Sequence, residues 1–434
     1  MDRLFHERER ASHLDLEAIE FSVRHAMHQV GGIALAKILN ADSGDHRGPR
    51  IPCGSGHEAS FLDYRVKKLT TVLSEVLVTR SYYHCKECQR GIFPKDRDLD
   101  IENTSFSPGV RRMMARVGAK ESFDEGRSDL EALAGVMVTA KAVERVSEEI
   151  GGQIEVAAIQ ERENAMEGRV VPLWPVIPKM YIAIDGTGVP VSPSETEGRK
   201  GKDETGIAKT RESKLGCVFT QSKLDKEGYA VRDDDSTTYV GAIETAYECG
   251  KRIYAEAVRR GLNRVQKVTV LGDGAPWIWG ISSDHFPGAI QIVDLYHALE
   301  HIAHLGKILY GPRGWVLPRW IETQSEALKE GEVEKVIAVM KRLKPQGHSR
   351  KEEVRKTIHY FETNKDRMRY ADFRKQGLFV GSGVMEAGCK TIVGQRLKQS
   401  GMRWTVQGAN AIIALRCTQI SGRWEKFWEN RTAG

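Results

Sequence analysis

The sequence of 434 residues has no uninterrupted apolar run of about 18 residues, the length that a membrane-spanning helix needs. Its start, MDRLFHERERASHLD, is charged and lacks the apolar core of a signal peptide. The cysteines are few and odd in number: there are seven, and four of them stand alone (Cys217, Cys249, Cys389 and Cys417). This pattern excludes the disulfide framework of a small secreted protein. We therefore expect a soluble cytoplasmic protein with no membrane partner.

Several common catalytic motifs are absent as well. The chain has neither a phosphate-binding P-loop nor a dinucleotide-binding glycine motif. Ser382 lies in Val-Gly-Ser-Gly, which lacks the Gly-x-Ser-x-Gly spacing of serine hydrolases. Asp185 precedes Gly-Thr and Asp273 precedes Gly-Ala, so neither forms the Asp-Thr-Gly or Asp-Ser-Gly motif of an aspartic protease.

The composition is that of an ordinary globular protein, with 40% hydrophobic and 29% charged residues. At about 150 residues per domain, the length favours two to four domains. Changes in apolar periodicity and a proline-rich stretch at 168–180 mark the boundaries. We expect an N-terminal helical segment (1–45), a zinc-ribbon-like β module (46–110), a helix-turn-helix-like region (111–167), the first part of an α/β core (168–309), a helical insertion (310–375) and the last core helix with a basic tail (376–434).

The core segment alternates between strands and helices. Its apolar strands are nearly continuous, which is typical of a sheet covered on both faces. Three strands in succession followed by strand–helix units predict a mixed sheet that begins with an antiparallel meander. The expected strands are 180–185, 214–221, 237–243, 267–273 and 289–294, with helices at 244–260 and 295–309.

Three acidic residues stand where such a fold would gather them. Asp185 and Asp273 each end an apolar strand, and Glu386 lies at an expected helix start. Asp-Gly at a strand end is also a common turn, so neither aspartate is decisive alone. Three neighbouring carboxylates repel one another unless a cation lies between them, and Mg²⁺ prefers oxygen ligands. Two such ions would activate a water or a 3′-hydroxyl for in-line phosphoryl transfer on nucleic acid.

These residues lie in runs that resemble the ISKra-type transposases of bacterial insertion sequences. The runs are DGTGVP, RESKLGCVFTQ, VLGDGAPWIW, FPGAIQIVDLYHALEH, GSGVMEAGCK and RLKQSGMRW, and the resemblance covers roughly residues 50–425. It implies a DDE transposase, related to the Mutator-like enzymes, with an RNase H-like core and an all-helical insertion before the last acidic residue. It also implies Asp185, Asp273 and Glu386 as the catalytic residues that hold two Mg²⁺ or Mn²⁺ ions, with Asp294 and His297 as a supporting D-x-x-H motif.

Asp294, His297, His301 and His304 share one face of the helix expected at 295–309. A His-x-x-x-His pair can bind zinc, but the His-Glu-x-x-His general base of metalloproteases is missing. We favour a structural or active-site-supporting role for Asp294 and His297, and we expect His301 and His304 to be ordinary helix residues near a polar surface.

A second group of potential metal ligands lies in the β module. Cys53 and His57 form a C-x-x-x-H, and Cys85 and Cys88 form a C-x-x-C after the expected hairpin. Three thiolates and an imidazole would complete a tetrahedral zinc site, with His57 in place of the cysteine usual in the first knuckle. The alternatives are a decayed site whose C-x-x-C is only packed, and a redox pair, which lacks a surrounding thioredoxin-like pattern.

Two regions carry candidate DNA contacts. Residues 129–151 indicate either a helix-turn-helix or a plain helical hairpin, with Thr139 capping the second helix. The stretch 389–434 has eight basic and two acidic residues, so it is either a DNA-binding surface or a solvated basic helix. The candidate contact residues are Lys141, Arg145, Arg396, Lys398, Arg403 and Trp404.

Three hypotheses follow. The first is a transposase that binds the terminal inverted repeats of its element as an oligomer and cuts and joins double-stranded DNA near the bacterial nucleoid. The second is a transposase-derived DNA-binding protein without catalysis, which would be expected to lack a catalytic carboxylate, and none is missing. The third is a metal-dependent nuclease, which would not need the N-terminal DNA-reading modules.

Overall fold

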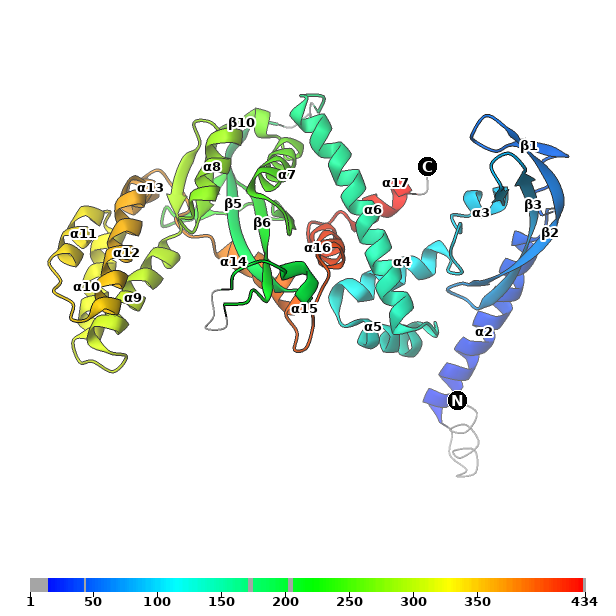
Figure 1. Cartoon of the computed structure of the whole chain (residues 1–434), viewed down its shortest axis with the longest axis horizontal. Helices are drawn as coiled ribbons and strands as arrows, with labels where there is room; N and C mark the ends of the chain where they lie inside the picture. Colours follow the sequence, from blue (N-terminus) through cyan, green and yellow to red (C-terminus); the bar gives the residue numbers. More distant parts are fainter. Residues whose placement is uncertain (1–14, 43, 171–174, 202–205, 432–434) are drawn as a thin grey trace. The chain divides into compact units, whose positions relative to one another are not determined.

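A computed structural model describes residues 15–42, 44–170, 175–201 and 206–431 (Figure 1). The chain divides into two compact units: one contains residues 1–149 and 426–434, and the other contains residues 150–425. No helix within these described ranges is both long and apolar enough to cross a membrane.

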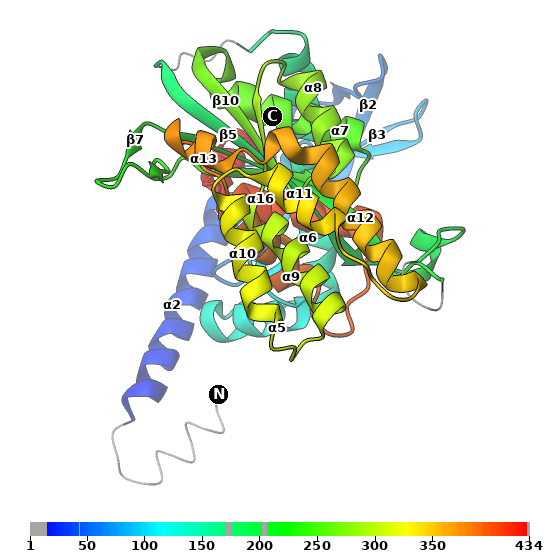
Figure 2. The same cartoon turned by 90° about the vertical axis from the view of Figure 1, so that its left-hand side faces the viewer.

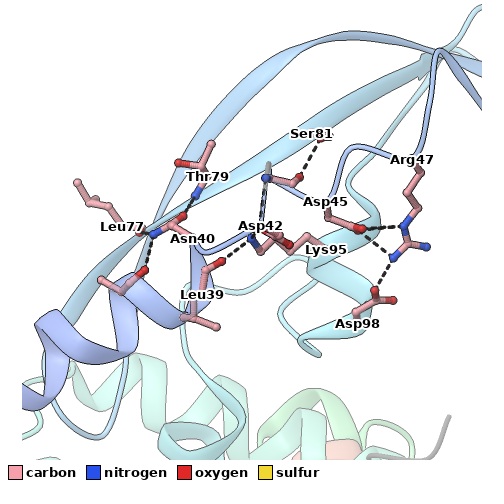
Figure 3. Close-up of polar contacts among 12 residues, drawn as sticks. Leu39, Asn40, Asp42, Asp45, Arg47, Leu77, Thr79, Ser81, Lys95 and Asp98 are labelled. Carbon is pink, nitrogen blue, oxygen red and sulfur yellow. Dashed lines mark hydrogen bonds and ion pairs between the residues drawn. The ribbon is translucent and has the colours of Figure 1, made fainter.

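Helix α2 (Leu16–Leu39) is the first described element of the first unit and lies in the helical segment expected at 1–45, of which residues 1–14 and 43 are outside the described ranges. Asp15 caps the helix, because its side chain accepts a hydrogen bond from the Ala18 amide at 3.3 Å. Asn40 ends it and ties it to the sheet, donating to the Leu77 carbonyl and accepting from the Thr79 amide, each at 2.8 Å (Figure 3).

The same unit contains a four-stranded antiparallel sheet in the order β1-β2-β3-β4. Its centre is the long β2–β3 hairpin that the sequence predicts. A buried ion pair between Arg80 and Asp96 (2.6 Å) joins this hairpin to the short helix α3. The elements are β1 (Arg50–Pro52), β2 (Glu58–Thr70), β3 (Glu75–Cys85), β4 (Arg90–Ile92) and α3 (Pro94–Asp98).

Three further helices follow, and they include the pair expected at 129–151. The chain turns at Gly135, whose φ of +69° is accessible to glycine at little cost. Thr139 then caps the next helix as expected, accepting a hydrogen bond from the Ala142 amide at 3.1 Å. The Ser147 hydroxyl reaches the Met114 carbonyl (3.3 Å) and so joins the third helix to the first. The helices are α4 (Pro108–Lys120), α5 (Phe123–Asp129, continued by a π turn, Leu130–Ala134) and α6 (Ala140–Met166).

The second unit is built on a five-stranded mixed sheet in the order β11-β10-β5-β6-β9. β5, β6 and β9 form an antiparallel meander, and β10 and β11 add to β5 in parallel. This confirms the predicted mixed sheet and its initial meander. The strands are β5 (Ile177–Pro190), β6 (Thr210–Gln221), β9 (Thr238–Ala242), β10 (Val265–Gly272) and β11 (Ile290–Val293); a short hairpin, β7 (Lys223–Leu224) and β8 (Ala230–Val231), follows β6.

Helices cover both faces of this sheet, as the apolar strands predict. On one face Gly216 has no side chain, which lets Ile253 of α7 lie directly on the strand. On the other face the Tyr239 hydroxyl donates to the Val384 carbonyl of α14 at 3.0 Å. The helices around the sheet are α7 (Ala246–Arg259), α8 (Pro276–His285), α14 (Gly383–Gly388, continued by a π turn, Cys389–Gly394), α15 (Gln395–Leu397) and α16 (Val406–Ile420), and α17 (Trp424–Arg431) ends the described chain.

The segment between β11 and α14 is helical and forms a group of its own (Figures 1 and 2). Two hydrogen bonds from α12 attach it to the core: the Trp279 indole donates to Asn364 at 3.1 Å, and the Tyr360 hydroxyl donates to the Asp273 carbonyl at 2.8 Å. The helices are α9 (Leu295–Tyr310), α10 (Leu317–Lys329), α11 (Val333–Lys341), α12 (His348–Asn364) and α13 (Tyr370–Lys375).

Candidate active site and Cys/His cluster

Three aspartates lie at one edge of the five-stranded sheet. In the register of β5 and β10, Leu271 pairs with Ala183, so two residues later Asp273 is level with Asp185. In the register of β10 and β11, Gly272 pairs with Val293, so Asp294 is the next neighbour in the row. The carboxyl ends of parallel strands are the usual place for a ligand site in an open α/β sheet.

A cavity of about 180 Å³ opens at this edge. It brings together all five residues that the sequence assigns to the catalytic and supporting set. Side chains from β5, from the ends of β10 and β11, and from α9 and α14 meet there, although they are far apart in the sequence. The lining residues are Ile184, Asp185, Asp273, Asp294, Tyr296, His297, Glu300, Ser382, Gly383 and Glu386.

Asp185 is the most enclosed of the three expected catalytic carboxylates. Burial, together with the nearby negative charge of Asp273, raises the pKa of Asp185, against opposing hydrogen bonds from Cys389 and the Gly186 amide. The thiol of Cys389 lies 3.3 Å from one carboxylate oxygen, and the Gly186 amide lies 2.7 Å from the other. Two carboxyl groups that oppose each other's ionisation in this way favour a cation between them.

Asp273 lies in a tight turn between β10 and α8. Its carboxylate accepts a hydrogen bond from the Ala275 amide at 2.8 Å, while its carbonyl accepts one from Tyr360. Gly274 has a φ of +101°, and a β-carbon there would lie 2.6 Å from the Tyr360 ring. Glycine is therefore required at this position, both for the backbone conformation and for the approach of the insertion helix.

Glu386 lines the same cavity but does not reach the two aspartates. Its side chain is 70% exposed and forms an ion pair with Lys390 at 2.7 Å. The hydrogen bond from Lys390 lowers the pKa of Glu386. In the described part of the chain, these carboxylates do not form a group of ligand atoms as close as the one in the N-terminal sheet.

Asp294 uses both carboxylate oxygens to join two helices. One oxygen caps α9, accepting from the amides of Tyr296 (2.7 Å) and His297 (3.1 Å). The other accepts hydrogen bonds from the amide and the hydroxyl of Ser382, at the start of the helix that carries Glu386. Asp294 therefore fixes His297 and the base of α14 relative to the sheet, which is a positioning role.

The transposase hypothesis predicts that Asp294→Asn lowers DNA cleavage by roughly 10- to 100-fold, the effect usual for a residue that orients catalytic ligands. An amide can accept at only one end, so either the α9 cap or the Ser382 contact is lost. Ser382→Ala, which removes one of the four hydrogen bonds, should have a smaller effect. Cleavage rates of both variants, compared with their thermal unfolding midpoints, test this. Wild-type cleavage by Asp294→Asn would show that the clamp does not position the site.

The other two histidines of α9, His301 and His304, contact residues of the helical insertion. His301 stacks on Tyr360 with ring centroids 4.0 Å apart, and burial lowers the pKa of His301. His304 lies 3.8 Å from Glu353. Within the residues that the structure covers, Asp294, His297, His301 and His304 do not form a close metal-ligand group. His301 is half-buried rather than on the surface, whereas His304 is exposed.

In the N-terminal sheet, Cys53, His57, Cys85 and Cys88 do form such a group. Their ligand atoms all lie within 4.8 Å of one another, so the prediction that these four residues come together is confirmed. The Cys88 sulfur lies 3.2 Å from Nδ1 of His57 and 3.7 Å from the Cys53 sulfur. Backbone amides at Ser55 and His57 lower the pKa of Cys53 to about 7, which favours the thiolate.

The local backbone explains this closeness. β1 ends just before Cys53, whose amide donates to the His57 carbonyl at 2.9 Å and so closes the first loop. The Cys88 amide points at the Cys85 sulfur (3.4 Å) in the turn between β3 and β4. Cys53 and Cys85 are buried in the small core of this sheet end. Three thiols and an imidazole are a donor set that suits Zn²⁺.

Two of the predicted DNA-contact residues are wrongly assigned. Arg396 and Trp404 are buried, with the guanidinium 4.9 Å from the indole ring centre and the indole nitrogen donating to the Leu397 carbonyl. They pack the chain after α15 and have no surface to offer to DNA. Lys398 is exposed, and its amine reaches the Thr187 hydroxyl at 2.6 Å, two residues beyond Asp185.

The remaining predicted contacts are exposed. Arg403 lines a cavity of about 880 Å³ together with Arg199 and Lys209. On α6, Lys141 forms an ion pair with Glu144 at 2.9 Å, and Arg145 is exposed. A role of these residues in DNA binding stays a prediction.

Sequence reasoning missed three residues that support the cavity. In the sequence, Cys389 stands out only as an isolated cysteine, and Ser382 only because it lacks the spacing of a serine hydrolase motif. No sequence pattern marks Tyr360. Cys389 and Ser382 lie within four residues of Glu386, and that proximity was the available signal. Tyr360 reaches the site from the insertion, 87 residues after Asp273, so no local pattern could indicate it.

The fold and the site define a class of two-unit protein. One unit is a mixed α/β unit with a carboxylate-lined cavity, and the other carries a Cys/His cluster. The chain belongs to an uncharacterised protein family, UPF0236, whose model matches residues 56–200 and 254–431. A UPF0236 protein of Caldanaerobacter subterraneus subsp. tengcongensis is 24% identical over 369 residues, covering 82% of this chain and 68% of that protein. For a second one the identity is also 24%, and the chain spans 64% of its length.

A more distant relative is the UPF0236 protein in the vanSb 3′ region of Streptococcus gallolyticus. It is 19% identical over 369 residues, covering 84% of this chain and 75% of that protein. Among solved structures, the Drosophila P element transposase strand transfer complex aligns with 77% of this chain and 83% of its own, at 8% identity and a TM-score of 0.27. This structural similarity is too low to support any conclusion.

Proposed function

We propose that this protein is a DDE-type DNA transposase and that the cavity beside β5, at the ends of β10 and β11, is its catalytic site. The observation that supports the proposal most strongly is that Asp185, Asp273 and Glu386 line one cavity of about 180 Å³ together with Asp294 and His297. The mixed sheet, an antiparallel meander extended by two parallel strands, is the arrangement that an RNase H-like core has. The chain would bind the ends of its element, cut them and join them to target DNA.

In this proposal each residue of the cavity has its own role. Asp185 and Asp273, on adjacent strands, would be the main ligands of the divalent cations, and Glu386 would complete the ligand set from α14. Asp294 sets the position of that helix through Ser382. Tyr360 and Gly274 hold the turn that carries Asp273. Lys398, beside Thr187, offers a positive charge to the DNA backbone near Asp185.

The donor set of the cavity suits a divalent cation. Carboxylate oxygens are the ligands that Mg²⁺ and Mn²⁺ prefer. The pKa of Asp185 is raised mainly by burial and in smaller part by the negative charge of Asp273, and a cation between the two carboxylates would relieve that charge. When bound by Asp185, Asp273 and Glu386, two such ions would activate the attacking oxygen and stabilise the leaving one. The exposed position of Glu386 leaves its side chain able to turn from Lys390 into the cavity.

The N-terminal unit supplies DNA recognition in this proposal. The Cys/His cluster would hold one Zn²⁺ and fix the end of its sheet. The α5–α6 pair would meet DNA with Lys141 and Arg145 on the exposed face of α6. Two DNA ends must be held at once, so the active form would be an oligomer.

Cleavage of a duplex that carries the element's own end tests the proposal. Purified protein should nick that duplex at the element boundary with Mg²⁺ or Mn²⁺ and not with EDTA. A shuffled duplex of equal length is the control. Metal-dependent cutting of both duplexes alike would favour the nuclease hypothesis, and specific binding without cutting would favour the binding protein.

A further inference from the structure

Helix α2 presents apolar residues on two faces. Leu35, Ala36 and Leu39 on one face pack against the sheet of the first unit, in the core formed by Leu69, Val76, Val78 and Ile101. The Arg24 guanidinium on the same side donates to the Leu133 carbonyl at 3.1 Å. This inner face accounts for the attachment of the helix to its own unit.

The outer face of α2 has no such explanation. It carries a row of large apolar side chains, each more than a third exposed, and most are more than half exposed. The row extends over nearly the whole of a helix of 24 residues, and a continuous exposed apolar surface of this kind usually marks an interaction site. We call it the outer stripe: Leu16, Ile19, Val23, Met27, Val30 and Ile33, with the exposed Ala26 beside Met27.

The spacing of the outer stripe matches that of a helix pair. Positions 16, 19, 23, 26, 30 and 33 are apolar and alternate at intervals of three and four, as the core positions of a two-stranded coiled coil do. Two copies of the same stripe can pair about a twofold axis, since such an interface uses one surface twice. In an antiparallel pair Leu16 would meet Ile33, Ile19 would meet Val30 and Val23 would meet Ala26.

The charges near the two ends of α2 favour an antiparallel pair of helices. The N-terminal turns of α2 carry Asp15, Glu17 and Glu20, whereas Lys37 lies near its other end. An antiparallel pair places Lys37 of one copy near the acidic turns of the other. A parallel pair would set like charges against each other at both ends.

We propose that the outer stripe of α2 is a dimerisation surface, on which α2 of a second copy of this chain docks antiparallel. This inference does not depend on the proposed catalytic function. It provides one route by which two copies, and hence two DNA-binding units, are held together before DNA is present.

Sedimentation of the DNA-free full chain tests the proposal. The wild type should sediment with twice the chain mass of 48.6 kDa at micromolar concentration. Val23→Glu with Val30→Glu should raise the dimer dissociation constant at least about 100-fold, because the seam would bury four unpaired charges. His25→Glu, which adds a charge to an exposed position of α2 off the stripe, is the matched control and should stay dimeric. Circular dichroism would verify that all the proteins are folded.

The direction of pairing has its own test. Lys37→Glu should weaken the dimer roughly two- to fivefold at low salt, and adding Glu17→Lys, at the acidic end that Lys37 of the other copy approaches, should restore most of the affinity. Failure of the second change to restore the affinity would overturn the antiparallel arrangement. A wild-type monomer, with the stripe covered by residues 1–14 or by another protein, would overturn the proposal, and so would a dimer that the double Val variant leaves intact.

Discussion

Asp185→Asn, Asp273→Asn and Glu386→Gln should each lower the rate of strand cleavage by at least about 1000-fold, with little change in the affinity for element-end DNA. Each replacement keeps the shape of the side chain and removes one carboxylate from the cavity. Because the three are proposed to act as one unit, a double variant of the two aspartates should be no slower than either single variant. Single-turnover cleavage and a binding titration on the same duplex separate the two effects.

Glu300→Gln is the matched control for these variants. Glu300 lines the same cavity, and its side chain is more exposed than that of Glu386, but it lies outside the proposed catalytic set. Its neutralisation should change the rate less than about tenfold, as expected of a charge near the site that holds no reacting group. Near-normal cleavage by any one of the three catalytic variants would remove that residue from the set. A loss in Glu300→Gln equal to theirs would show that general charge, not a defined set of ligands, controls the reaction.

Removal of metal from the Cys/His cluster should unfold the end of the N-terminal sheet. Structural zinc in small modules contributes about 10–16 kcal/mol of binding free energy, which is also folding free energy. The core at this sheet end is small and includes two of the ligands themselves, Cys53 and Cys85, so little apolar packing remains without the metal. We expect about one zinc per chain in the purified protein. Chelation should abolish the amide-exchange protection of β1, β4 and the adjoining ends of β2 and β3, while the other end of the hairpin, packed in its own core, stays protected.

Two histidines offer a matched pair for this test. His57→Ala should lose zinc, because the imidazole of His57 lies among the cluster's sulfur atoms. His84→Ala, which changes the residue next to Cys85 and leaves all four ligands in place, should keep it. Elemental analysis and amide exchange are the readouts. Zinc-free wild-type protein with a fully protected sheet would contradict the metal site and leave a merely packed C-x-x-C.

The sequence predicts the core strands well because their signal is local. Uninterrupted apolar residues mark β5, β6 and β10, and the aspartates follow at the ends of their apolar runs. β5 itself continues past Asp185 to Pro190, because β6 pairs with it over that whole length. This extension carries polar and glycine residues, so nothing in its composition distinguishes it from a loop.

The contacts of the site were harder to predict because they depend on segments far apart in the sequence. Tyr360 meets Asp273 only because the helical insertion folds back onto the core. Arg396 and Trp404 stand in a basic stretch that suggested a surface, yet they pack on each other in the interior. A basic composition indicates how many charges a segment has, but not which of its side chains face inward.

In the proposed function, the cavity lined by Asp185, Asp273 and Glu386 joins DNA strands. The most direct test is a strand-transfer assay with purified protein, pre-cut element ends, a target plasmid and Mg²⁺ or Mn²⁺, run beside Asp273→Asn. We predict covalently joined products that need the metal and are absent with the variant. Joined products of equal yield from Asp273→Asn, or active cleavage with no joining under any of these conditions, would contradict a DDE transposase.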